Sequence, residues 1–361
     1  MRNDKKIGVW SMILVALNLS LAKYLLLVPS FIVQEVGNSA WIVTILKGVA
    51  SVVIFAVVSV LYRPYVEMGL GELACCSTGR FIGGVINAVL AGLIIARSAF
   101  LYRTISEALR TLEVANSSPE FIAMFILIPV VVCALKGFNA NVNISIIIIP
   151  FTIISVAILA LVLTPHFRLN NIMPILGEGP KEIFVSAAAK YGCSFEILIL
   201  LIFSKYMSGH KTFRKSGYIG LGAIALVTTV FTLMYCAAIP YPASKDFFFP
   251  LYQLSRLILA NAFMQHMEPL VVFIWAGIVL CALATMVLGA AELMASSAGV
   301  KDTSGFVPLL AMSVFFVGML PQSEISTYDF YRSTINISNY VFLLVIFVIL
   351  IIARGRKIEK A

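Results

Sequence analysis

The stretch EIFVSAAAKYGCSFEILILLIF, residues 182–203, decides the fold. As a helix it is about as long as a bilayer is thick, since roughly 20 apolar residues rising about 1.5 Å each are enough to span one. Lys190 and Glu196 nevertheless lie inside the apolar run, on either side of the polar step YGCS. A charge at mid-membrane costs on the order of 2.5–3.5 kcal/mol, and irregular backbone is tolerated there only around an enclosed cavity. This stretch therefore predicts one wall of a binding site inside a membrane.

The whole chain has the composition of a membrane protein. Of its 361 residues, 61% are hydrophobic and 12% are charged, whereas soluble domains are about 45–50% apolar and about 25% charged. The net charge of +9 does not indicate nucleic-acid binding, because the basic residues lie in short loops beside apolar runs. Six scattered cysteines without a CxxC step or a Cys/His cluster predict neither a disulfide framework nor a zinc site, and no cofactor is expected.

Apolar runs predict ten membrane spans within a single transmembrane domain that covers residues 1–361. The first run follows a basic N-terminus without a small-residue cleavage site, so we interpret it as an uncleaved span rather than a signal peptide. The predicted spans are residues 7–29, 39–62, 81–111, 119–135, 141–164, 182–203, 215–239, 264–297, 305–321 and 337–353.

The basic residues predict the orientation of these spans. With ten spans both termini lie on one side, and the termini and even-numbered loops hold fifteen Lys and Arg residues against six in the odd-numbered loops. Cytoplasmic loops are rich in Lys and Arg, so we expect both termini in the cytoplasm. The loop at residues 171–180 and the segment at 241–261 then share the outer face, and the segment should contain a short helix over the site.

Several charged residues fall within the predicted spans. Arg103 and Glu107 are one turn apart on the third span and can form an ion pair that helps the span insert, or join a wider charge network. Lys23, near the end of the first span, can extend its amine to the membrane surface or line a site. Arg97 has no carboxylate three or four residues away, so we expect it to pair with a carboxylate of another span, such as Glu196, or with a ligand.

The order of the spans predicts two halves of five. Spans six to ten repeat the size pattern of spans one to five, so the repeats would cover about residues 7–164 and 182–353. Lys23 and the region of Tyr191 then occupy corresponding places. Two polar-interrupted spans at matching positions indicate an inverted-repeat transporter fold with a site near mid-membrane, where we expect Lys23 to pair with Glu107 or Glu196.

Four features of the sequence resemble one known family. The loop NIMPILGEG at residues 171–179 is similar to its RPVLGEG loop, Glu196 stands where its sixth span carries a glutamate, and Arg103 with Glu107 matches an arginine–glutamate pair of its third span. The fourth feature is an aromatic–proline step followed by a basic residue, a glutamate and a tryptophan, here Phe249, Pro250, Arg256, Glu268 and Trp275. Over essentially its whole length the chain thus resembles the B subunits of bacterial spore germinant receptors (GerAB type), members of the amino acid–polyamine–organocation transporter superfamily.

This resemblance implies an all-α integral membrane fold with about ten spans in two inverted five-helix repeats, the LeuT-like fold. It implies a pocket for a small nutrient ligand, an amino acid first of all, between spans one, three, six and eight. It also implies a spore germination protein of the spore inner membrane that works in the lipid bilayer with A-type and C-type receptor subunits. The pocket residues carried over are Ala22, Lys23, Arg97, Cys193 and Cys281.

The complete candidate site adds Tyr24, Tyr191 and Gly192, which are sequence neighbours of Lys23 and Cys193. The predicted ligand-binding residues are Ala22, Lys23, Tyr24, Arg97, Tyr191, Gly192, Cys193 and Cys281, and the predicted charge network is Arg103, Glu107, Glu196 and Glu268. Two outcomes are open. Lys23 and Arg97 could bind an acidic ligand, or Glu107 and Glu196 could neutralise them around a small neutral pocket.

A second function is also compatible with these residues. Lys23, Lys190, Glu107 and Glu196 could exchange protons in a proton-coupled amino-acid permease, because burial and pairing change how readily a group titrates. An enzyme is not predicted, because the sequence contains no nucleophile–base pair, HExxH motif or acidic metal cluster.

Overall fold

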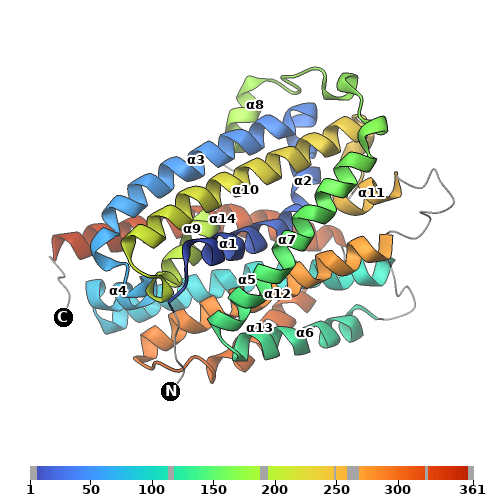
Figure 1. The fold of residues 1–361 in the computed structure, drawn as a ribbon. Helices are drawn as coiled ribbons and strands as arrows, with labels where there is room; N and C mark the ends of the chain where they lie inside the picture. Colours follow the sequence, from blue (N-terminus) through green and yellow to red (C-terminus); the bar gives the residue numbers. More distant parts are fainter. Residues whose placement is uncertain are drawn as a thin grey trace.

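The computed structural model describes residues 6–112, 118–187, 194–247, 249–257, 268–321 and 324–356. Within these ranges the regular structure is helical, and the extended pairing consists of one bridge between Ile7 and Met207. The helices form one bundle (Figure 1). α1 begins and α14 ends on one side of it, called the terminal face below, and α8 and α11 lie toward the opposite side, called the loop face.

The α-helices of the described residues are bounded as follows: α1 Val9–Tyr24, α2 Val28–Val36, α3 Ala40–Leu61, α4 Gly69–Thr78, α5 Arg80–Leu112, α6 Pro119–Leu135, α7 Phe138–Val162, α8 Pro180–Val185, α9 Ser194–Ile202, α10 His210–Ala238, α11 Pro250–Arg256, α12 Glu268–Ala298, α13 Phe306–Met319 and α14 Glu324–Gly355.

The apolar helices correspond to the ten predicted spans. Among the described residues, six stretches are long and apolar enough to cross a membrane: Val28–Leu61, Arg80–Arg110, Phe138–Val162, His210–Ala238, Val272–Ala298 and Ile337–Gly355. Three shorter apolar helices are Val9–Tyr24, Glu120–Leu135 and Phe306–Met319. The remaining span, the sixth along the chain, contains α8 and α9. The chain is therefore an all-helical membrane protein.

Span one consists of two helices rather than the single helix that the apolar run at 7–29 predicts. α1 ends at Tyr24, a turn follows at residues 25–27, and α2 starts at Val28 with Pro29 in its first turn. Proline lacks an N–H and disfavours helical geometry in the residue before it, so a continuous helix cannot pass through this point without strain. The first span therefore reaches Val36 as a discontinuous element.

Span six also contains two described helices, with residues 188–193 between them outside the described residues. Its loop-face helix α8 lies beside α2. Ser186 Oγ, directly after α8, donates a hydrogen bond of 2.8 Å to Glu35 Oε2 near the end of α2. Spans one and six are thus tied together on the loop-face side.

Close packing through glycine joins α3 to α10. At Gly217 a Cβ atom would lie 1.9 Å from Phe55 Cζ, and at Gly48 it would lie 2.4 Å from Ala225 Cβ. Both distances are shorter than any non-bonded contact, so only glycine permits the observed approach of the two helices. Small residues let helices approach closely in membranes, where packing rather than the hydrophobic effect drives association. This contact fixes one wall of the bundle.

The two segments that the sequence predicts on one face, residues 171–180 and 241–261, contact each other on the loop face. Tyr241 Oη donates a hydrogen bond of 3.0 Å to Glu178 Oε1, and Lys245 Nζ lies 3.8 Å from the same oxygen. The described parts of the loop at 171–180 and the segment at 241–261 therefore lie on one face, as predicted, and α11 is the short helix expected in the second. At the other end of the chain, α14 begins at Glu324, earlier than the predicted start at 337.

Candidate functional site

An ion pair connects the terminal-face helices of spans one and six. Lys23, in the last turn of α1, places its Nζ 2.6 Å from Oε1 of Glu196, in the first turn of α9. The Glu196 side chain is 4% exposed, so the pair is screened from solvent and each charge depends on the other. Of the two partners predicted for Lys23, the structure shows Glu196.

Ala22 and Tyr24, the other predicted residues of span one, contact two neighbouring helices near this ion pair. The carbonyl of Ala22 accepts a hydrogen bond of 3.2 Å from Trp275 Nε1 of α12, which satisfies an acceptor where the helix ends. Tyr24 is buried, and Lys47 Nζ of α3 lies 5.4 Å from the centroid of its ring. Trp275 of span eight and Lys47 of span two therefore both contact span one beside its break.

Arg97 of α5 binds span ten, which the sequence did not predict. Its Nε donates a hydrogen bond of 2.7 Å to Ser338 Oγ, and its Nη2 donates one of 2.5 Å to Asn339 Oδ1. Both acceptors are buried and neutral. These two acceptors are neutral oxygens. The pairing of Arg97 with a carboxylate, either of another span such as Glu196 or of a ligand, stays a prediction.

One aromatic ring contacts both cations of the site. Lys23 Nζ is 5.4 Å and Arg97 Cζ is 5.0 Å from the ring centroid of Phe195, the residue before Glu196. Arg97 also lies 5.1 Å from the ring centroid of Phe342 in α14. The negative face of an aromatic ring attracts a cation. The rings thus hold two positive charges near one another without supplying a negative charge.

Arg103 and Glu107, the pair predicted on the third span, contact each other within α5. Arg103 Nη2 lies 2.5 Å from Glu107 Oε1, and Arg110 Nε lies 3.0 Å from the other oxygen, Glu107 Oε2. Arg103 Nη1 also contacts Met319 Sδ of α13 at 3.2 Å. The intrahelical pair predicted from the spacing is confirmed, and Glu107 uses both oxygens on its own helix.

Of the remaining predicted residues, the structure describes the side chain of Cys281. Cys281 of α12 is buried against α7, with its Sγ 3.4 Å from Ser145 Oγ and 3.6 Å from the carbonyl oxygen of Asn141. Its role in ligand binding stays a prediction. Tyr191, Gly192, Cys193, Lys190 and the side chain of Glu268 lie outside the described residues.

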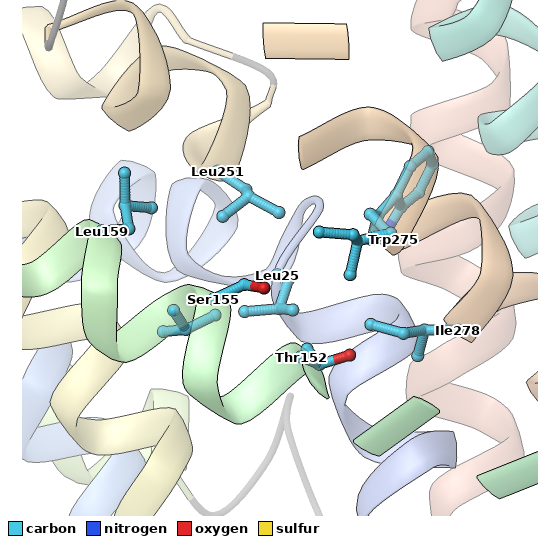
Figure 2. Close-up of a pocket in the computed structure, with 9 residues that line it drawn as sticks. Leu25, Thr152, Ser155, Leu159, Leu251, Trp275 and Ile278 are labelled. Carbon is cyan, nitrogen blue, oxygen red and sulfur yellow. The ribbon is translucent and has the colours of Figure 1, made fainter. Parts of the chain in front are cut away.

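A small cavity lies beside the discontinuity of span one (Figure 2). It is lined by Leu25, Leu251, Trp275, Ile278 and residues of α7 that include Thr152 and Ser155. Figure 2 shows Trp275 and Ile278 of α12 on one side of the cavity and Leu159 of α7 on the other. The hydroxyls of Thr152 and Ser155 donate to carbonyls of their own helix. The cavity is therefore effectively apolar and suits an uncharged group.

A second ion cluster lies on the terminal face. Lys205, just after α9, places its Nζ 2.8 Å from Glu292 Oε2 of α12 and 3.1 Å from Glu72 Oε1 of α4. Tyr206 Oη donates to Glu292 Oε1 at 2.5 Å, and Ile7 N donates to the Tyr206 carbonyl at 2.8 Å. Burial lowers the pKa of Lys205, but the Glu292 carboxylate and then Glu72 outweigh it, so that pKa is raised. This cluster binds the end of span six to three other elements.

Comparison with known proteins identifies the family. A model described as spore germination protein matches residues 6–327, which is most of the chain. The chain belongs to the spore germination protein family. Spore germination protein YndE of Bacillus subtilis (strain 168) is 22% identical over 354 residues, which cover 95% of each chain. Spore germination protein A2 of the same organism is 22% identical over 362 residues, which cover 98% of this chain and 97% of the relative.

Solved structures show that this spore germination protein has a transporter fold. Mhp1, a nucleobase-cation-symport-1 family transporter in a closed conformation with bromovinylhydantoin bound, matches with a TM-score of 0.64 at 11% identity, over 98% of this chain and 94% of its own. A manganese transporter of Eremococcus coleocola matches with a TM-score of 0.65 at 12% identity, over 95% and 78%. The spore germination protein is therefore a transporter-like membrane protein of the LeuT-like fold. The boundaries of its two five-helix repeats stay a prediction.

Sequence reasoning missed part of the surroundings of this site. Ser338 and Asn339 form a polar step in the otherwise apolar stretch of span ten, and Phe195 directly precedes Glu196. The polar step was the available signal, because adjacent polar residues within an apolar span usually face a partner in the bundle interior. Lys47, in span two, gives the same signal.

Proposed function

We propose that this spore germination protein is the ligand-sensing membrane subunit of a germinant receptor. It binds a small nutrient molecule, an amino acid first of all, and so triggers germination. The observation that carries the proposal is the Lys23–Glu196 ion pair, which joins the first half of the chain to the second. A polar ligand that competes for either charge changes the contact between α1 and α9, and a ligand shifts a conformational equilibrium only through such differential contacts.

An amino acid has the groups that this site can bind. Its carboxylate suits Arg97, whose planar guanidinium is built to bind carboxylates, and its ammonium suits Glu196. The predicted residues Ala22, Tyr24 and Cys281 would shape the space around it. In this proposal the protein resides in the spore inner membrane with both termini in the cytoplasm, and A-type and C-type receptor subunits are its partners. The spore germination names of its relatives support this assignment.

Replacement of Arg97 by methionine tests the proposal. Arg97→Met keeps the length of the side chain and removes its charge, so the response to the germinant should weaken while the protein still inserts. The measurement is protein abundance in the spore membrane together with germination against germinant concentration. Arg168→Met is the matched control, because Arg168 is exposed in a loop outside the spans. Normal abundance with an unmoved dose–response curve would remove Arg97 from the site.

The transporter fold favours one alternative, a proton-coupled amino-acid permease. In that function Lys23 and Glu196 exchange a proton as the substrate passes. Uptake of labelled amino acids into proteoliposomes under an imposed pH gradient separates the two functions, since a pure sensor binds its ligand without accumulating it inside.

A further inference from the structure

Two asparagines of different spans are completely buried where α1, α7 and α12 pack against one another. Asn18 of α1 donates a hydrogen bond of 3.4 Å from its Nδ2 to the carbonyl oxygen of Ile278. The carbonyl oxygen of Asn141, in the first turn of α7, lies 3.6 Å from Cys281 Sγ. Ile278 and Cys281 are less than one turn of α12 apart. Both asparagines therefore contact the same short stretch of α12.

The side chains of these asparagines contain buried polar atoms that no described residue pairs. The atoms are Asn18 Oδ1, Asn141 Oδ1 and Asn141 Nδ2. Exchanging the amide oxygen and nitrogen of Asn18 would not supply a partner, because the bond to the Ile278 carbonyl needs an N–H group. A buried polar atom without a partner costs about 1–3 kcal/mol. An apolar side chain would avoid this cost, so the two asparagines indicate a bound polar species.

The chemistry of the unpaired atoms suits water. Asn18 Oδ1 and Asn141 Oδ1 are acceptors, whereas Asn141 Nδ2 is a donor. A water molecule has two O–H donors and lone pairs that accept, and a buried water typically makes about three hydrogen bonds. A sodium ion would suit the two oxygens but would be repelled by the amide N–H groups, which bear partial positive charge. The set therefore favours a neutral molecule that both donates and accepts.

We propose that ordered water occupies the junction of α1, α7 and α12, bound by Asn18 and Asn141. The water accepts from Asn141 Nδ2 and donates to the two side-chain oxygens, so it connects α1 to α7 beside Cys281. Water-mediated hydrogen bonds are nearly as favourable as direct ones. The site thus stabilises the packing of three spans, and it is separate from the Lys23–Glu196 ion pair and from the identity of the germinant.

Radiolytic labelling of two buried cysteines tests the proposal. A short X-ray pulse converts bound water into hydroxyl radicals, which oxidise the nearest side chains. Cys281 and Cys236 are 2% and 3% exposed, so bulk solvent reaches both equally poorly, but Cys281 lies beside the proposed water. The purified full-length protein is pulsed in lipid nanodiscs, and mass spectrometry follows oxidation at each cysteine. We expect Cys281 to be oxidised several-fold faster than Cys236.

Replacement of Asn141 links this labelling to the proposed water. Asn141→Leu approximately keeps the volume of the side chain and removes its two unpaired atoms, so oxidation of Cys281 should fall to the rate of Cys236. Asn87→Leu is the matched control. Asn87 is also completely buried, donates from Nδ2 to a carbonyl at 3.0 Å and has an Oδ1 without a partner among the described residues, but it lies between α5 and α4. This control should leave the oxidation of Cys281 unchanged.

Three results would overturn the proposal. The first is an equal oxidation rate of the two cysteines in the parent protein, a comparison that holds even if Asn141→Leu fails to accumulate. The second is fast oxidation of Cys281 that persists in Asn141→Leu, because the labelling water would then be bound elsewhere. The third is a higher unfolding temperature in sodium chloride than in choline chloride that Asn141→Leu abolishes, since the site would then bind a cation.

Discussion

Lys23 and Glu196 lie 173 positions apart in the chain and 2.6 Å apart in space, Nζ to Oε1. Lys23 belongs to the discontinuous span one, and Glu196 belongs to span six. The contact therefore joins span six to the end of α1, beside the break in span one, through opposite charges of which the Glu196 side chain is 4% exposed.

Removal of one member of this pair should destabilise the protein more than removal of both. Lys23→Met leaves the Glu196 carboxylate buried without its partner, which typically costs about 3–5 kcal/mol, whereas a double replacement removes both desolvation penalties. The measurement is the unfolding temperature of the purified variants in detergent. If the double variant unfolds at the same temperature as Lys23→Met or at a lower one, the unpaired Glu196 carboxylate is not the cause of the destabilisation.

The ion cluster of Lys205 should stabilise the protein with a defined pH dependence. Glu292 and Glu72 raise the pKa of Lys205 above its usual 10.5. A raised pKa contributes stability that is complete below the unfolded value and is lost as pH rises through the folded value. The difference in unfolding temperature between the parent and Lys205→Met should therefore stay constant from about pH 6 to about pH 9 and shrink only in strong alkali. A difference that disappears near neutrality would contradict this assignment.

Glycine packing between α3 and α10 offers a test with an internal control. Gly217→Ala places a methyl group against the Phe55 ring, so the helices must separate or the ring must move. Overpacking typically costs about 1–3 kcal/mol. Gly222→Ala is the matched control, since Gly222 lies on the same helix with nothing within 4 Å of an added Cβ. We expect reduced abundance and a lower unfolding temperature for Gly217→Ala alone. Equal behaviour of the two variants would mean that this contact does not fix the wall.

The orientation in the membrane can be measured by cysteine labelling. From the excess of Lys and Arg in the termini and even-numbered loops, we expect a cysteine placed beside Lys357 to react with a membrane-impermeant maleimide only after the membrane is opened. Leu169→Cys, at a loop residue that is 82% exposed, should react in intact cells. The native cysteines are first replaced by serine. Labelling beside Lys357 from outside would reverse the proposed topology.

The sequence predicted the fold well because membrane insertion makes strong demands on composition. Long apolar runs give the spans, and the charged residues inside them stand out against that background. Lys23 and Glu196 could be recognised in this way, and one of the two partners considered for Lys23 was correct. The local pair Arg103–Glu107 followed from helical spacing alone.

What the sequence could not predict are contacts between distant spans that involve neutral groups. Nothing in the spacing links Arg97 to Ser338, or the indole of Trp275 to the carbonyl of Ala22. A backbone acceptor has no signature in the sequence, and an arginine can be satisfied by neutral oxygens as well as by a carboxylate. The end of α1 was likewise hidden, because Pro29 lies beyond the turn and not at its start.

The terminal-face halves of spans one and six are joined at two levels. Inside the bundle Lys23 bonds Glu196, and at the terminal face the backbone N–H of Ile7 donates to the carbonyl of Tyr206. Because these two segments are in contact at both ends, we expect a tilt or rotation of one to move the other. We expect a change at the Lys23–Glu196 contact to alter the second contact as well, beside which Lys205 and Tyr206 bind Glu292. Under the proposed function, such a coupling would let ligand binding in the interior affect the face where the termini lie.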